Sequence, residues 1–336
     1  HYPLAAGMLE EAIEVSFSFS LKNEETDTGR QVYLFALAVL VWIGCATTVW
    51  NYGKGNHGVR LFENGIKILT ALIATSFAWV VISAGLNGSI NWSDVLWGFV
   101  PHSLPDTGIG VTTMMAALGT AVGINMTFVY GYTILRRGWG TEQRDLARYD
   151  IVLGLVLPYL IITSLISVAA AASLYDGEST TQNRLAPAQA SIMFAQAGMG
   201  DLVGRLIFPL GVLGMAAGSL VMHMLTCGAA AMEMFDLDED STAYRLACLI
   251  PTPAVLGVFL WSSMGPYVIL PTSAFCGLLL PIAYIGWLIL NNRSDYLGND
   301  MPTGSKALVY NSAMSLCVIL VVSSVLYSTG VALGWL

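Results

Sequence analysis

The stretch Gly119-Thr120-Ala121-Val122-Gly123-Ile124-Asn125-Met126-Thr127 lies at the centre of a long apolar segment, residues 108–135. Glycine is a poor helix former, and Asn125 competes for hydrogen bonds with its own backbone. In a membrane, a helix break frees backbone carbonyls, which are tolerated where they line a cavity or coordinate an ion. We therefore predict an interruption between Thr120 and Met126. Small residues of this kind are also typical of a face that packs against another helix, and both interpretations remain open.

The composition of the whole chain indicates a membrane protein. Of its 336 residues, 55% are apolar and only 11% are charged, whereas soluble domains carry about 25% charged residues. This excludes a soluble enzyme and a disordered chain, and the net charge of −8 also excludes a nucleic-acid binder. We predict an all-α polytopic membrane protein with one integral domain in the lipid bilayer, and no enzymatic activity.

The transmembrane spans follow from runs of about 20 apolar residues. Eight stretches qualify, namely 33–50, 65–86, 108–135, 151–174, 202–232, 245–262, 265–291 and 307–334. Residues 4–20 do not qualify, because Glu10, Glu11 and Glu14 fall on one helical face. We therefore assign 1–32 to an amphipathic segment at the membrane interface and 33–336 to the transmembrane domain.

The orientation follows from Lys and Arg, which concentrate in cytoplasmic loops. The loops after the first, third, fifth and seventh spans contain nine Lys and Arg residues, and the intervening loops, the last of them at 263–264, contain only Arg184. The first span should therefore run inward from outside. We expect one or three earlier helices in the full protein.

Two further polar features lie within the spans. His223 is alone on an apolar helix with no acidic neighbour in the sequence, so we favour a hydrogen-bonded packing role over a proton relay. Asp201 and Arg205 are one helical turn apart and are expected to form a surface pair.

Several motifs resemble the natural resistance-associated macrophage protein (NRAMP) family, and its divergent bacterial and NRAMP-related branches in particular. The matching stretches are Gly119-Thr-Ala-Val-Gly-Ile-Asn-Met126 with Leu135-Arg-Arg-Gly-Trp139, similar to the sixth helix of the family; Trp50-Asn-Tyr-Gly53 through Lys67-Ile-Leu; Arg144-Asp-Leu-Ala-Arg-Tyr-Asp150; and Gly277-Leu-Leu-Leu-Pro281 with Asn291-Asn-Arg293 and Leu297-Gly298. They occur in the order found in the family, and the resemblance covers about residues 33–336 as helices four to eleven.

This resemblance implies a LeuT-like inverted-repeat transporter fold, with helices one and six broken around a divalent metal. Helix one, which carries the metal-binding Asp of the family, is not identifiable here. At the Met-Pro-His-type motif of helix six this chain reads Ile124-Asn125-Met126, so the Pro and His are replaced. The implied metal ligands are the carbonyls of Ala121 and Gly123 and the side chains of Asn125 and Met126. Oxygen ligands suit Mg²⁺ or Mn²⁺.

We therefore expect a secondary transporter of Mn²⁺ or Mg²⁺ in the cytoplasmic membrane that works by alternating access. Protons are the candidate coupling ion, and no cofactor is expected. Two alternatives remain open. One is a transporter of the same fold for an amino acid or another organic solute, since broken helices serve both. The other is a membrane subunit that transports nothing.

Overall fold

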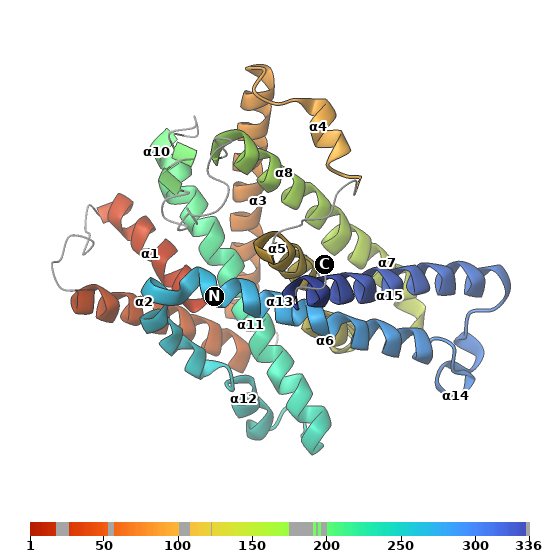
Figure 1. Cartoon of the computed structure of the whole chain (residues 1–336). Helices are drawn as coiled ribbons and strands as arrows, with labels where there is room; N and C mark the ends of the chain where they lie inside the picture. The colour runs from red at the N-terminus through yellow and green to blue at the C-terminus, as the bar shows by residue number, and fades with distance from the viewer. Residues whose placement is uncertain are drawn as a thin grey trace. The chain divides into compact units, whose positions relative to one another are not determined.

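The computed structural model describes residues 1–17, 27–52, 57–100, 108–121, 123–174, 191–192, 194–195 and 200–333, and within these ranges it contains helices and no strand (Figure 1). The chain forms two compact units. The first comprises His1–Val100 and Val129–Ser263, and the second comprises Pro101–Phe128 and Met264–Leu336. Each unit is described separately below.

The first unit is built mostly from long helices. In chain order they are α1 (Tyr2–Phe17), α2 (Asp27–Trp50), α3 (His57–Leu86), α4 (Trp92–Trp97), the end of α6 (Ile124–Arg136), α7 (Arg144–Ile151), α8 (Leu157–Leu174), α10 (Gly200–Leu202), α11 (Phe208–Phe235) and α12 (Thr242–Cys248). A π-helical turn joins α7 to α8, another joins α10 to α11, and short 3₁₀ turns lie before α7 and after α12.

Helix α11 is the central element of this unit, because α1, α2, α3 and α12 all pack against it. Small residues permit the close approach. A Cβ added at Gly211 would lie 2.9 Å from the Cβ of Ile73 in α3. On another side, Leu220 and Met224 are buried with Cys45 of α2 in one hydrophobic cluster. Close packing of small residues is the usual way in which membrane helices associate.

The second unit contains α5 (Gly108–Ala121), the start of α6, most of α13 (Val258–Leu290), α14 (Ser294–Leu297) and α15 (Gly304–Ala332). Helices α5 and α15 pack together, and α5 also meets α13 at two glycines. A Cβ added at Gly119 would lie 2.4 Å from the carbonyl oxygen of Ser273 and 2.5 Å from the backbone nitrogen of Gly277. Neither Gly119 nor Gly277 therefore accommodates a larger residue without a backbone shift.

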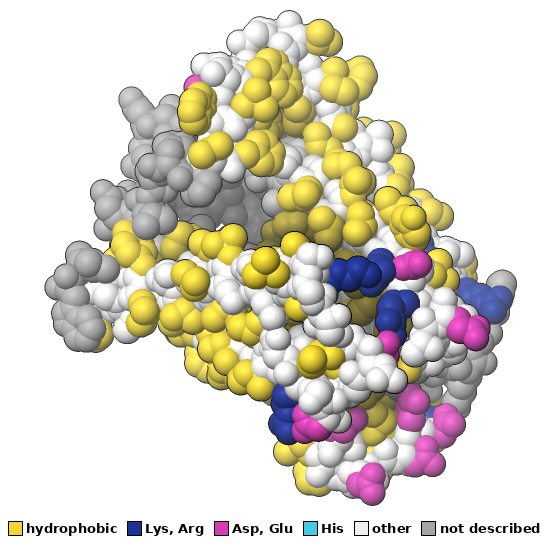
Figure 2. Space-filling model, turned by 90° about the vertical axis from the view of Figure 1, so that its right-hand side faces the viewer, with side chains coloured by type: hydrophobic (Ala, Val, Ile, Leu, Met, Phe, Trp, Pro, Cys, Tyr) yellow, Lys and Arg dark blue, Asp and Glu magenta, His cyan; other side chains and the backbone are white. Residues whose placement is uncertain are grey.

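The polytopic all-α prediction is confirmed. Seven of the described helices are long and apolar enough to cross a membrane, and hydrophobic side chains cover much of the face shown in Figure 2. The 108–135 stretch is missing from these seven because it is divided into α5 and α6, which have 14 and 13 residues. Neither piece alone reaches the length of about 20 residues that a span needs.

The loop expected at 263–264 is not present, because α13 runs through these residues as one helix of 33 residues. A 3₁₀ turn, Thr252–Gly257, lies between α12 and α13; it contains Pro253 and follows Pro251. Proline removes a backbone donor and ends α-helices in this way. The predicted loop at 263–264 is therefore wrong. The alternation of loop charges depends on two crossings in this region, and two described stretches there, Thr242–Leu260 and Thr272–Leu290, are each long and apolar enough to cross a membrane.

The N-terminal helix α1 is largely buried against other helices of the first unit. It packs against α2 and α11, and Glu10 and Glu11, expected on an exposed face, are 4% and 0% exposed. Their burial is possible because arginines from other elements reach them. Arg30 of α2 lies 3.2 Å from Glu10, and Arg205 lies 3.3 Å from Glu11.

Candidate functional site

The predicted interruption of the 108–135 helix is present in the structure. Helix α5 ends at Ala121, α6 begins at Ile124, and Gly123 between them is not helical. The helix therefore breaks where glycine and Asn125 weaken it most. The packing interpretation of the same stretch is also realised, because Gly119 lies against α13 just before the break.

The two predicted carbonyl ligands lie on opposite sides of this break. Ala121 is the last residue of α5, where the final carbonyls of a helix lose their intrahelical partners. Gly123 precedes α6, and its carbonyl oxygen accepts a bond from the backbone N–H of Thr127 at 3.3 Å and from the hydroxyl of Thr127 at 3.4 Å. The carbonyl of Ala121 is therefore the freer of the two for a cation.

The other two predicted ligands, Asn125 and Met126, lie in the first turn of α6. Their backbone is described, but their side chains fall outside the described part of the structure, so their role as ligands stays a prediction. Among the described residues no group of three or more His, Cys, Asp or Glu side chains is placed to hold a metal ion. Within those limits, the oxygen atoms at the break are the candidate ligands.

The helix dipoles give the break a definite polarity. A helix carries partial negative charge at its C-terminal end and partial positive charge at its N-terminal end. At this break the C-terminal end of α5 and the N-terminal end of α6 are separated by two residues. A cation is favoured by the carbonyl end of α5, and an anionic group by the amide end of α6. The geometry thus suits a cation held mainly from the α5 side.

A second polar centre is the acidic face of α1. Arg205, in the π-helical turn before α11, lies 3.3 Å from Glu11 and 3.7 Å from Glu14. The expected pairing of Arg205 with Asp201 is wrong, because the α1 carboxylates, not Asp201, are the ion-pair partners of Arg205 among the described residues. Partners 194 residues apart cannot be identified from local spacing. In a membrane protein, buried ion pairs of this kind are functional candidates by default.

His223 is hydrogen-bonded, as the sequence favours, but its side chain is exposed and is not packed between helices. Its Nδ1 lies 2.6 Å from the carbonyl oxygen of Ser219, one turn earlier in α11, and its ring centroid lies 5.4 Å from that of His1. A carbonyl only accepts, so Nδ1 carries the proton in this contact. The imidazole is thereby bound within its own helix.

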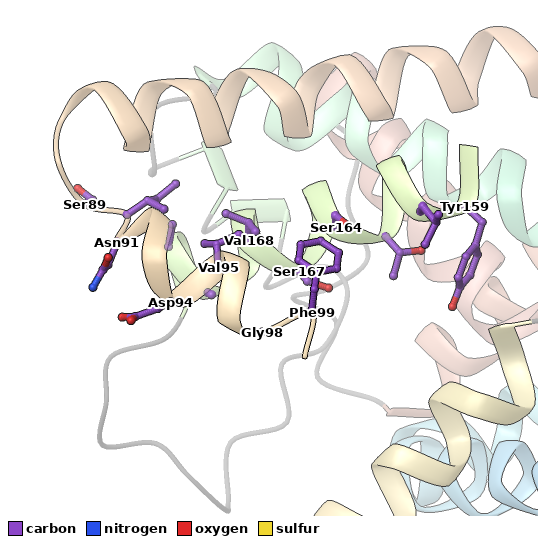
Figure 3. Close-up of a pocket in the computed structure, with 15 residues that line it drawn as sticks. Ser89, Asn91, Asp94, Val95, Gly98, Phe99, Tyr159, Ser164, Ser167 and Val168 are labelled. Carbon is purple, nitrogen blue, oxygen red and sulfur yellow. The ribbon is translucent and has the colours of Figure 1, made fainter. Parts of the chain in front are cut away.

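A cavity with a volume of about 570 Å³ lies between α4 and α8 in the first unit. Figure 3 shows Val95 and Phe99 on the α4 side and Ser164 and Ser167 on the α8 side, with Asp94 pointing away at the edge. The lining is mostly apolar, with hydroxyls and one carboxylate. That set lacks the several converging oxygen ligands that a divalent cation requires.

Another cavity, of about 220 Å³, lies beside the end of α6. It is bounded by Val129, Tyr132 and Thr133 of α6, by Leu225, Ala229 and Met232 of α11, and by Tyr52, Glu239 and Tyr244, with Leu135 at its edge. No sequence pattern indicates this cavity, because its walls come from four separate parts of the chain. It places hydroxyl and carboxylate oxygens next to the second half of the broken helix.

Comparison with known proteins identifies the family. A family model described as natural resistance-associated macrophage protein-like (Nramp) matches residues 30–328. No curated protein matches the sequence. The family match covers most of the chain, including the broken helix and the long helices of both units, and it confirms the resemblance found in the motifs. The chain belongs to the Nramp family, whose members are integral membrane transporters of divalent metal ions rather than enzymes.

Proposed function

We propose that this protein moves Mn²⁺ or Mg²⁺ across the cytoplasmic membrane by alternating access, with the ion bound at the break between α5 and α6. The observation that carries the proposal is the break itself, between Ala121 at the end of α5 and Ile124 at the start of α6, in a segment without a charged side chain. Such a segment can supply backbone carbonyl oxygens and an amide oxygen to a cation, but it contains no carboxylate. The cation's charge is then balanced from the helix dipole and from ligands outside this segment.

The choice of metal rests on ligand hardness. The carbonyl of Ala121 and the amide of Asn125 are hard oxygen ligands, which favour Mg²⁺ and Mn²⁺ over softer transition metals. Met126 follows Asn125 directly, so its soft sulfur is the competing feature. We infer that oxygen dominates, because the carbonyl end of α5 is where a cation is favoured. A preference for Cd²⁺ or Fe²⁺ over Mn²⁺ would instead indicate that Met126 is a direct ligand.

Family membership favours this function over both alternatives. An organic solute with a carboxylate would be expected to use the amide end of α6. A subunit without transport activity would have no need to maintain a helix break that costs backbone hydrogen bonds in the membrane. The two alternatives remain outcomes that the experiment below can distinguish.

Protons are the proposed coupling ion, and the acidic face of α1 supports this. Glu11 is fully buried and bound to Arg205, whose side chain is 31% exposed. Buried acidic residues inside membrane proteins mark proton relays in pumps and transporters. Co-measurement of internal pH and metal uptake in proteoliposomes tests the point, since uncoupled uptake would leave the internal pH unchanged.

The main test is Asn125→Ala, measured as Mn²⁺ and Mg²⁺ uptake in proteoliposomes together with the melting temperature. We expect uptake to fall by a factor of roughly 5 to 150, which corresponds to the loss of a polar contact worth about 1–3 kcal/mol. The melting temperature should stay near that of the parent protein. A side-chain amide that ligates an ion contributes to binding, whereas one that bonds a neighbouring helix contributes about 0.6 kcal/mol to stability.

Asn311→Ala is the matched control. Asn311 lies in α15 and exchanges side-chain hydrogen bonds of 2.9 and 2.7 Å with Asn292. Loss of the Asn311 side chain and of these hydrogen bonds should lower the melting temperature slightly and leave uptake unchanged. If Asn125→Ala behaves like this control, Asn125 belongs to the scaffold and the proposed site at the break loses its side-chain ligand.

A further inference from the structure

The second half of the broken helix is held at its far end by a tyrosine. The Tyr132 hydroxyl of α6 donates a hydrogen bond of 2.6 Å to Oε1 of Glu233, at the end of α11. The cavity of about 220 Å³ lies next to this bond and separates Val129 and Thr133 of α6 from Ala229 of α11. The two helices are thus joined by a polar contact beside a cavity, not by continuous side-chain packing.

A neighbouring tyrosine on α6 binds in a different direction. The Tyr130 hydroxyl lies 3.1 Å from the carbonyl oxygen of Ala147 and 3.1 Å from Oδ2 of Asp150, both in α7. Arg137 reaches the same carboxylate at 3.7 Å. Residues two apart on a helix point about 200° away from each other. The end of α6 is therefore fastened to α7 on one side and to α11 on the other.

These two attachments differ in what surrounds them. On the α7 side, the carboxylate of Asp150 accepts a hydrogen bond from Tyr130 and forms an ion pair with Arg137. Three side chains therefore take part in that contact. On the α11 side, the Tyr132–Glu233 bond stands at the edge of a cavity, and Glu233 is exposed to solvent. A hydrogen bond beside empty space can be broken without opening a packed core, since few neighbouring atoms have to separate. The α11 side is the side on which α6 is freer to move.

We propose that the Tyr132–Glu233 hydrogen bond is a latch that closes the cavity between α6 and α11 at the cytoplasmic end of the transporter, and that Tyr132 and Glu233 position α6 during the transport cycle. The assignment to a transport cycle rests on the proposed function. The latch lies at the end that the loop charges place in the cytoplasm, next to Arg136 and the acidic run 233–240. Because α6 begins at the break, release of its far end frees one of the two helices that meet at the proposed ion site.

The strength of this hydrogen bond fits the role. A hydrogen bond from a phenol to a carboxylate is stronger than a bond between neutral groups, but exposure of Glu233 to solvent reduces its net value. We expect removal of the latch to shift the balance between closed and open forms on the order of three- to tenfold. Such a shift is enough to change a gating rate and too small to unfold the protein.

The test measures how fast a cysteine introduced at Ala229, which lines the cavity, reacts with a small membrane-impermeant thiol reagent in inverted membrane vesicles. Peptide mass spectrometry distinguishes its label from that of the native cysteines nearby. Tyr132→Phe and Glu233→Ala should each raise the labelling rate at least threefold, and the double variant should add nothing further, as expected for partners in one contact. Tyr149→Phe, an exposed tyrosine of α7, is the matched control and should leave the rate unchanged.

Uptake kinetics in the same variants separate positioning from ion binding. Loss of the latch should change the maximal rate of Mn²⁺ uptake by at least threefold and leave the KM within a factor of two, because the ion site itself is intact. Equal labelling rates in Tyr132→Phe, Glu233→Ala and Tyr149→Phe would overturn the latch. Labelling does not depend on which ion is carried, so failure of the proposed metal function would appear in uptake alone.

Discussion

In α1, the carboxylate of Glu11 is completely buried and lies 3.3 Å from Arg205, whereas the broken segment from Gly108 to Leu135 contains no charged side chain. The first region satisfies its polar groups by pairing opposite charges between helices. The second exposes backbone groups by interrupting a helix. The comparison distinguishes a buried contact between charged side chains from the proposed ion site at the break.

The largest effect is expected from breaking the charge pairing. Arg205→Met would leave Glu11 buried without the guanidinium beside it, and removal of one partner from a buried pair costs about 3–5 kcal/mol. The effect should lie at the low end, because Arg205 is 31% exposed and Glu14 keeps some contact with solvent. A thermal unfolding assay in detergent should therefore show a strongly lowered melting temperature.

The double variant Glu11→Gln with Arg205→Met serves as the control. It removes both charges and should recover much of the lost stability, because a neutral pair leaves no buried charge uncompensated. If the double variant is no more stable than Arg205→Met alone, packing around Arg205, and not its charge, accounts for the effect.

The next effect concerns the region of the break. Gly277→Ala would place a Cβ 2.8 Å from the carbonyl oxygen of Met115 in α5. We expect a loss of about 1–3 kcal/mol, since overpacking of this size forces a backbone shift. Uptake should fall as well, because α5 carries Ala121 at its end. Unfolding and Mn²⁺ uptake measured on one preparation would show whether the two losses go together.

Gly286→Ala is the matched control for this prediction. It lies on the same helix, α13, but a Cβ there meets no atom within 4 Å. Alanine is the better helix former by about 1 kcal/mol, so this variant should be neutral or slightly stabilised. A comparable loss in Gly286→Ala would mean that α13 is sensitive to any added methyl group and that the contact with α5 has no special role.

The two regions also differ in how far the sequence predicts them. The break is predictable because glycine and Asn125 act on their own backbone, which is a local effect. The burial of α1 is not, because its arginine partners lie 20 and 194 residues away. A run of glutamates normally indicates an exposed face. Only the fold brings Arg30 and Arg205 to these carboxylates.

The long helices and the candidate site are predictable to different degrees. Apolar run length identifies most spans, but it splits α13 at 263–264, because hydropathy alone does not distinguish a short loop from a helix that continues. For the site, the residues indicate where the helix breaks, and only the family resemblance implies which groups bind the ion. No local sequence pattern predicts the hydrogen bond beside the cavity, since its two partners, Tyr132 and Glu233, are 101 residues apart.

The smallest effect is expected from an ion pair that is not buried. Arg293 and Asp295 lie between α13 and α15, and the Arg293 Nε donates to Oδ1 of Asp295 at 3.0 Å with both side chains more than half exposed. The guanidinium lowers the pKa of Asp295 below its usual value of 3.8. A lowered pKa in the folded state stabilises the protein above the unfolded value, and this contribution is lost as the pH falls through the folded value. The loss of this contribution is therefore confined to pH values below about 4, and the contribution itself is present at pH 7.

Asp295→Asn should nevertheless leave the melting temperature nearly unchanged at pH 7, because water screens this exposed pair and makes its contribution small. This result would sharpen the contrast with Arg205, because both variants remove one partner of an arginine–carboxylate pair and differ in burial. Melting curves of the two variants, recorded side by side at pH 7, provide the comparison. If Asp295→Asn destabilises the protein as much as Arg205→Met does, burial is not what makes the α1 contact important, and the distinction drawn between the paired charges and the open break would lose its physical basis.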